Sequence, residues 1–175
     1  MRQRAAAGLL LILAIITFYN MTTWQKSPSI REHPPVKGAA GAQFYYHEDI
    51  NPFYPHLAPY GKTKKGYITG NCTWYAWGRA CEIAGRQLPH MFIGNAGTWW
   101  EQNRERGWYP YGQEPRRGAI ACYATHVAIV EQAEPLLVSE SGWKVAEKKE
   151  AIYFNCGRPW NKKEDIVGYI YVNGT

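Results

Sequence analysis

The hydrophobic pattern begins with a nearly continuous apolar run over residues 5–19, preceded by Arg2 and Arg4. Basic residues followed by a run of about 15 apolar residues are typical of a signal peptide or a short membrane anchor. No good small-residue cleavage site follows closely, and Trp24 suits the membrane interface. We therefore predict a signal-anchor over residues 1–24, with a cleaved signal peptide as the alternative.

The next stretch, residues 25–43, is rich in Pro, Gly and Ala and has no periodicity, which predicts an extended linker. Aromatic residues begin at Phe44, and residues 44–175 are long enough to bury a core. Basic residues before the apolar run predict that this domain lies outside the cytoplasm, in the periplasm or cell wall. It is either anchored to the membrane through the N-terminal helix or secreted.

Within the domain, helical patterns precede strand patterns. Residues 72–85 place apolar side chains on one helical face, with Asn71 as N-cap and Gly85 as the stop, and a shorter helix is predicted at 95–105. Four later runs predict strands, at residues 118–123, 126–130, 135–140 and 166–172. This order predicts an α+β fold in which N-terminal helices pack on an antiparallel sheet.

Charge and composition limit the classes of partner that this chain is expected to bind. The formal net charge is +6, and aromatic residues make up 15% of the chain, with 8 Trp and 13 Tyr. Because no block of five or six like charges occurs, we expect an anionic polymer rather than nucleic acid as partner. Asp49 and Asp165 are the only aspartates and no CxxC occurs, so we expect no metal and no cofactor. We expect a monomer.

The strongest candidate for chemistry is Cys72. It opens the predicted helix, where unpaired N–H groups and the helix dipole favour a thiolate. His126 is the candidate base, because the other histidine of the domain proper, His90, follows Pro89 in a loop and is predicted to lie on the surface. Cys81 and Cys122 are interpreted as small buried hydrophobes, and Cys156, beside Gly157, is predicted to lie in a loop. Two of these three cysteines could form a disulfide.

A carboxylate can hold the histidine. If a hairpin is centred on Ala133, His126 lies directly opposite Glu140 on the same sheet face, where the carboxylate favours the imidazolium. A register slip of one residue would turn Glu140 to the other face. Glu131 is the competing acid, although it is more simply explained as a solvated charge at a strand end.

These residues carry a resemblance to a known family. The segment GNCTWYAWGRA, residues 70–80, is similar to the nucleophile motif of the CHAP family of cysteine, histidine-dependent amidohydrolases/peptidases. The later blocks RGAIA, HVAIVE, VSE and GYIYV follow in that family's order. The resemblance spans roughly residues 50–175. It implies a papain-like fold with Cys72 as nucleophile, His126 as general base and acid, and Glu140 as the orienting acid.

The chain departs from the family's pattern in one place. Many members have Asn two residues after the acid, whereas this chain has Gly142. Calcium-binding members have Asp upstream of the cysteine, and residues 60–71 contain none.

The resemblance also implies a substrate, since family members cleave amide bonds of bacterial cell walls. It indicates a peptidoglycan amidase or endopeptidase, bacterial or phage-encoded, with Asn71 assisting the oxyanion. Four tryptophans are expected to line a groove or the core: Trp74, Trp99, Trp100 and Trp143. The alternatives are a non-catalytic wall-binding module on the same fold and a cysteine amidohydrolase acting on a non-wall substrate.

Overall fold

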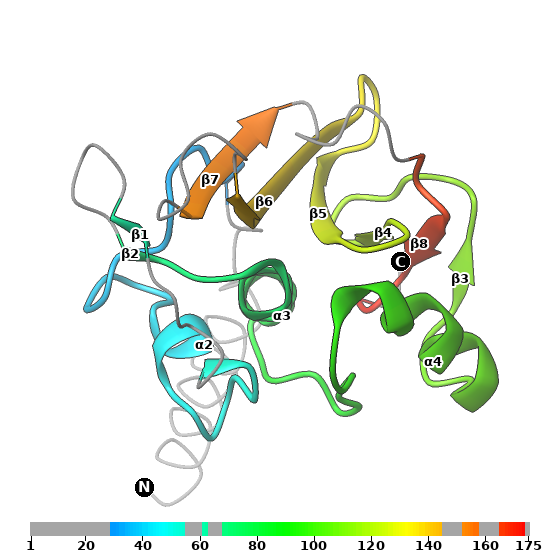
Figure 1. Ribbon diagram of the computed structural model, residues 1–175, viewed down its shortest axis with the longest axis horizontal. Coiled ribbons are helices and arrows are strands. Elements are labelled where there is room, and N and C mark those ends of the chain that lie inside the picture. Colours follow the sequence, from blue (N-terminus) through cyan, green and yellow to red (C-terminus); the bar gives the residue numbers. More distant parts are fainter. Residues whose placement is uncertain (1–28, 55–60, 63–67, 145–151, 158–164, 174–175) are drawn as a thin grey trace, which may run out of the picture.

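A computed structural model describes residues 29–54, 61–62, 68–144, 152–157 and 165–173. These residues form a six-stranded antiparallel sheet with helices packed against it (Figure 1). The predicted α+β class is therefore confirmed. The predicted anchor, residues 1–24, lies outside the described residues. Within the described ranges, no helix has both the length and the apolar character needed to cross a bilayer.

The central element is the helix α3, Cys72–Ala84, which agrees with the predicted helix. Its N-cap is Asn71, whose side chain accepts a hydrogen bond from the Trp74 backbone N–H at 3.0 Å. It ends at Gly85, whose φ of 67° is the left-handed conformation that glycine adopts without strain. The other helices given for the described residues are short: α2 (Gln43–Tyr46), the 3-10 turn η2 (Ala96–Thr98) and α4 (Trp99–Arg106), the last two covering the second predicted helix.

The large sheet has the strand order β3-β8-β4-β5-β6-β7. Its strands are β3 (Tyr111–Gly112), β4 (Ile120–Cys122), β5 (Val127–Gln132), β6 (Leu137–Lys144), β7 (Ile152–Gly157) and β8 (Gly168–Ile170). A separate ribbon pairs β1 (Gly61–Lys62) with β2 (Ile68–Thr69).

The four predicted strands correspond to β4, β5, β6 and β8. The two strands of the large sheet that the pattern missed, β3 and β7, are its edges, where a strand needs fewer apolar side chains. The prediction of a loop around Cys156 was wrong, because this residue lies in β7 and pairs with Ser139 of β6.

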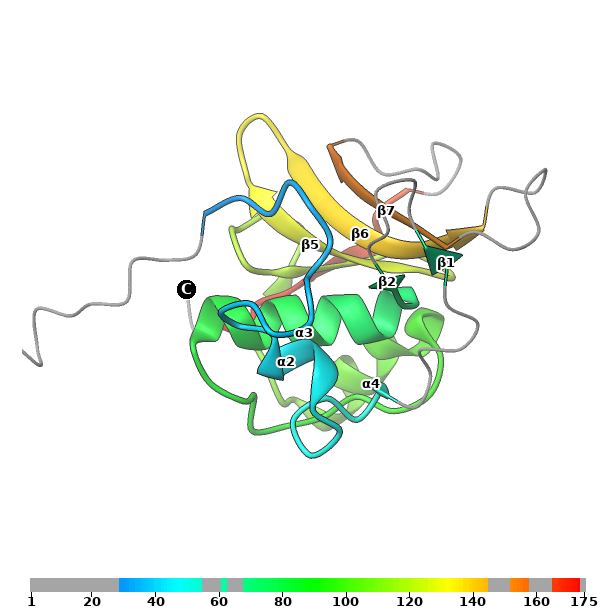
Figure 2. The ribbon, with the colours of Figure 1, turned by 90° about the vertical axis from the view of Figure 1, so that its left-hand side faces the viewer.

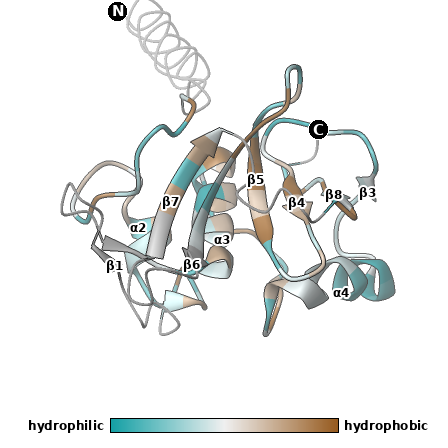
Figure 3. Ribbon diagram, turned by 45° about the horizontal axis from the view of Figure 1, so that its top comes forward, coloured by the Kyte–Doolittle hydropathy of each residue, from teal (hydrophilic) through white to brown (hydrophobic). Residues whose placement is uncertain are grey.

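The core lies between α3 and the sheet. Figure 2 shows α3 lying across one face of the sheet, with α2 on the helix's other side. Aromatic side chains dominate this core, and Trp74, Trp77 and Trp99 are fully buried. The hydrophobic strands β4 and β5 lie at the centre of the sheet, whereas α4 is mostly hydrophilic (Figure 3). Burying such rings supplies the largest apolar areas available to a small core.

The described part of the predicted linker is docked on the domain rather than extended away from it. Pro34 and Pro35 are buried, and the Tyr46 hydroxyl donates to the Pro35 carbonyl at 2.8 Å. Arg31 forms an ion pair with Glu82 near the C-terminal end of α3. Composition alone could not predict this docking, because the partner of Arg31 lies 51 residues further along the chain.

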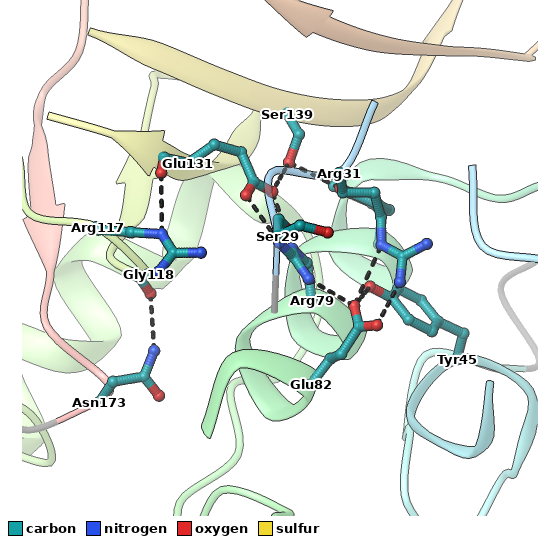
Figure 4. A network of polar contacts seen from close by, with 11 residues as sticks. Ser29, Arg31, Tyr45, Arg79, Glu82, Arg117, Gly118, Glu131, Ser139 and Asn173 are labelled. Carbon is teal, nitrogen blue, oxygen red and sulfur yellow. Dashed lines mark hydrogen bonds and ion pairs between the residues drawn. The ribbon is translucent and has the colours of Figure 1, made fainter. Parts of the chain in front are cut away.

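A buried ionic network fixes α3 to the sheet (Figure 4). The Arg79 guanidinium donates two hydrogen bonds of 2.8 Å to the Glu131 carboxylate on β5, and Ser139 Oγ donates to the same carboxylate at 2.7 Å. The prediction that Glu131 is a solvated charge was wrong, since only 1% of it is exposed. Burial by itself lowers the pKa of Arg79, but the bonds to Glu131 outweigh it and raise that pKa.

Replacing one member of this pair leaves the other charge buried without its partner. We predict that Arg79→Ala lowers the free energy of unfolding by about 3–5 kcal/mol, measured by urea denaturation. Arg104→Ala is the matched control, because its ion pair with Glu101 is exposed and contributes little. Equal effects of the two variants would contradict the structural role of the Arg79–Glu131 pair.

Candidate active site

Cys72 is the first residue of α3 and is partly exposed. Strand β6 holds the turn that precedes it, because Ser141 Oγ donates to the Gly70 carbonyl at 2.7 Å. The next residue of β6, Gly142, lies so close that a Cβ there would be 2.4 Å from the Cys72 backbone N. The start of the helix is therefore packed directly on the backbone of β6. At this position the thiol adjoins the first backbone N–H groups of α3, which favour negative charge.

The structure brings His126 and Glu140 to this thiol. His126 directly precedes β5 and Glu140 lies on β6, and they are 3% and 0% exposed. Their side chains meet with Nε2 of His126 at 2.7 Å from Oε2 of Glu140. The imidazole also hydrogen-bonds the Cys72 side chain. Because Nε2 is engaged by Glu140, the ring nitrogen that serves Cys72 is Nδ1.

The predicted register of the hairpin was wrong, but the prediction that Glu140 lies on the same sheet face as His126 was correct. The prediction pairs Ile129 with Leu137, whereas the structure pairs Ile129 with Ser139. A bulge between Val130 and Gln132 separates this region from the turn. The displacement is two residues, and an even displacement keeps every side chain on its face. Glu140 therefore still reaches His126, although the two residues are not directly opposite.

The electrostatics of the site favour an imidazolium. Burial by itself lowers the pKa of His126, but the hydrogen bonds to Cys72 and Glu140 outweigh it and raise that pKa to about 9. A histidine of ordinary pKa, near 6.5, would be mostly neutral at pH 7. The arrangement thus stabilises a positive charge next to the thiol, as a thiolate nucleophile requires.

Cys72 lines a cleft with a volume of about 610 Å³. Its walls come from the start of α3, the segment around η2 and the turn before His126, and are made of small or uncharged side chains: Asn71, Thr73, Gly94, Asn95, Ala96, Gly97, Thr98, Ala124 and Thr125. A second cavity, of about 500 Å³, is lined by residues 29–33 together with Arg79 and Glu82, and none of the three residues above borders it. The first cleft is therefore the one placed for chemistry.

The other three cysteines differ from Cys72. All four thiols are unpaired, so the disulfide considered among Cys81, Cys122 and Cys156 is not formed. Burial raises the pKa of Cys81 and of Cys156 to about 11 and raises that of Cys122 further. None of these three borders the cleft. His90 is exposed, as predicted, and stacks on Trp108 with the rings 5.7 Å apart.

The tryptophans expected in a groove or in the core have different positions. Trp74 and Trp99 are 0% exposed, so of these two locations the structure places them in the core and not in a substrate groove. Trp100 is half-buried and packs edge-on against Tyr111, with the rings 5.3 Å apart. Trp143 lies in β6, and its side chain lies outside the described part of the structure. Helical periodicity could not distinguish core from groove here, because both need apolar rings.

Asn71 acts first as a cap. Its Oδ1 accepts hydrogen bonds from the Thr73 hydroxyl and the Trp74 N–H, at 2.9 and 3.0 Å.

Sequence reasoning missed another amide, Asn155 on β7, whose Nδ2 donates to Oε1 of Glu140 at 3.0 Å. Strand pairing of β6 with β7 would have revealed it, since Glu140 and Asn155 are register partners. Among the described residues, no group of three or more His, Cys, Asp or Glu side chains is placed to hold a metal ion.

Removing the negative charge of Glu140 tests the origin of the imidazolium. We predict that Glu140→Gln lowers the pKa of His126 from about 9, because one of its two stabilising partners loses its charge. The measurement is an NMR titration of the His126 ring, assigned with His126→Gln. In the wild type, protonated His126 contributes stability below pH 6.5, and this contribution is lost as pH rises through about 9. An unchanged titration in Glu140→Gln would contradict the assignment of Glu140 as the partner.

Comparison with known proteins agrees with this geometry. No curated protein matches the chain. Residues 62–142 match the CHAP domain, and this stretch contains Cys72, His126 and Glu140. The resemblance seen in the motifs is thereby confirmed for residues 62–142, which match the CHAP domain.

Proposed function

We propose that this chain is a cysteine hydrolase that cleaves amide bonds of bacterial peptidoglycan, on a papain-like arrangement of helix and sheet. CHAP domains are typically amidohydrolases or peptidases. The observation that carries the proposal is the hydrogen-bonded series Cys72–His126–Glu140, which opens at Cys72 into an uncharged cleft. Nucleophile, base and orienting acid are the three groups that thiol-dependent amide hydrolysis requires.

The first half of the reaction forms a thioester. The Cys72 sulfur attacks the amide carbonyl carbon, and its proton is held on His126 Nδ1. The oxyanion is met by backbone N–H groups in the first turn of α3. Because Asn71 Oδ1 caps the helix, the contribution of this side chain to the oxyanion would come from its Nδ2.

The second half restores the enzyme. The His126 imidazolium gives its proton to the leaving amine as the C–N bond breaks, which leaves the acyl group on Cys72. A water molecule then gives a proton to His126 and its oxygen attacks the thioester, which releases a carboxylate and the thiol. Glu140 stays ionised throughout and holds the ring.

The surroundings of the site suit a wall polymer. The formal net charge of +6 attracts an anionic polymer through diffuse charge. The cleft walls carry hydroxyl, amide and small apolar groups, which fit a peptide stem with short side chains. The scissile bond lies either between muramic acid and the stem peptide or within the peptide. We further propose that the domain acts outside the cytoplasm as a monomer, anchored by its N-terminal segment or secreted.

Digestion of purified sacculi tests this function. We predict that the full chain releases soluble fragments whose new termini are identified by mass spectrometry. Cys72→Ala and Cys72→Ser should fold and release none, because the serine hydroxyl is a far weaker nucleophile beside an imidazolium. New amino termini on the stem peptide identify an amidase, and cuts within stems or bridges identify an endopeptidase.

The alternatives give different results in the same experiment. Binding to sacculi without any Cys72-dependent product from several wall types would support a non-catalytic wall-binding module. Cys72-dependent cleavage of small amides with intact sacculi would support a hydrolase for a non-wall substrate. Either result would overturn the proposal.

A further inference from the structure

We propose that Asn155 is a positioning residue of this active site, which holds the Glu140 carboxylate in the plane that serves His126. The inference rests on the proposed function and extends it to a strand outside the matched region, since the CHAP match ends at residue 142. It assigns a role to β7, an edge strand of the sheet.

Both oxygens of the Glu140 carboxylate have a directional partner. Oε2 meets Nε2 of His126 at 2.7 Å, and Oε1 accepts from Nδ2 of Asn155 at 3.0 Å. Glu140 is 0% exposed, so water does not substitute for a lost partner on its surface. Two hydrogen bonds to two different oxygens fix the rotation of the carboxylate group. A single hydrogen bond to His126 would leave that group free to rotate.

Strand β6 itself has no room for an amide side chain beside Glu140. Many CHAP members carry Asn two residues after the acid, and this chain has Gly142 there. A Cβ at Gly142 would lie 2.4 Å from the Cys72 N and 2.5 Å from the Asn71 Cα. Its φ of +89° is also strained for any residue with a side chain. Because the start of α3 occupies this space, an orienting amide has to come from another strand.

The pairing of β6 with β7 places Asn155 next to Glu140. Glu140 and Asn155 are register partners, so their side chains extend from the same face of the sheet. A bulge between Ser141 and Trp143 follows immediately. The amide is a neutral donor, which stabilises the ionised carboxylate without competing with His126 for its charge.

The test compares Asn155→Ala with Cys156→Ala in the full chain. Cys156 is the next residue of β7 and pairs with Ser139, so its replacement controls for general disturbance of this strand. We expect Asn155→Ala to lower kcat on sacculi roughly tenfold to a hundredfold, as loss of a hydrogen bond to a buried charged group does, with KM little changed. Asn155→Gln, which keeps an amide donor, should recover part of kcat, and Cys156→Ala should match the wild type.

A second readout does not depend on the substrate. The charged and titratable groups around His126 are Cys72 on α3, Glu140 on β6 and Tyr123 beyond β4, whose ring centre is 5.8 Å away. If Asn155 positions Glu140, NMR titration of folded Asn155→Ala should give a lower His126 pKa than Cys156→Ala. Thermal unfolding of each variant identifies the folded fraction.

The outcomes separate the two proposals. Wild-type kcat and wild-type His126 titration in Asn155→Ala would overturn the positioning role and leave the hydrolase function standing. A kcat loss without a change in the His126 titration, or a KM increase instead of a kcat loss, would also overturn it. An inactive wild type would overturn the proposed function, while the titration would still decide the role of Asn155.

Discussion

The close approach of α3 to β6 is the constraint on which the site depends. Gly142 lets the backbone at Asn71 and Cys72 rest on the strand, and Ser141 ties the strand to Gly70. Any side chain at Gly142 would push the start of the helix outward, and with it the thiol. The same strand carries Glu140, so one contact sets the distance between the nucleophile and the acid that holds its base. His126, which directly precedes the neighbouring strand β5, lies between the thiol and the acid and completes the hydrogen-bonded series.

The two ends of α3 carry different kinds of polar chemistry. At its start, a half-exposed thiol meets a histidine whose charge is stabilised by a buried carboxylate. Near its end, Arg79 is fully paired with Glu131 and Glu82, and the chain before α2 is bound there as well. A helix held at both ends keeps the nucleophile in place without a disulfide, which agrees with four unpaired thiols. The polar groups away from the cleft therefore contribute rigidity rather than chemistry.

Much of this could be predicted from the sequence, because local signals were strong. Asn71 and Gly85 mark the ends of α3, and short apolar runs mark β4, β5 and β8. Longer-range features could not be predicted in this way. The burial of Glu131 depends on Arg79 lying opposite it, and the docking of residues 29–43 depends on Glu82 and Tyr46. Asn155 was missed for the same reason, because its role follows from β6–β7 pairing and from no local motif.

The central claim is that Cys72 is the one activated thiol among the four cysteines, and that His126 activates it. Limited alkylation with iodoacetamide at neutral pH, followed by peptide mass spectrometry, measures this directly. The account predicts modification at Cys72 first, with Cys81, Cys122 and Cys156 modified far more slowly because burial raises the pKa of each. It also predicts that His126→Ala slows the reaction of Cys72. Equal labelling of Cys72 and Cys156, or a rate at Cys72 unchanged by His126→Ala, would contradict it.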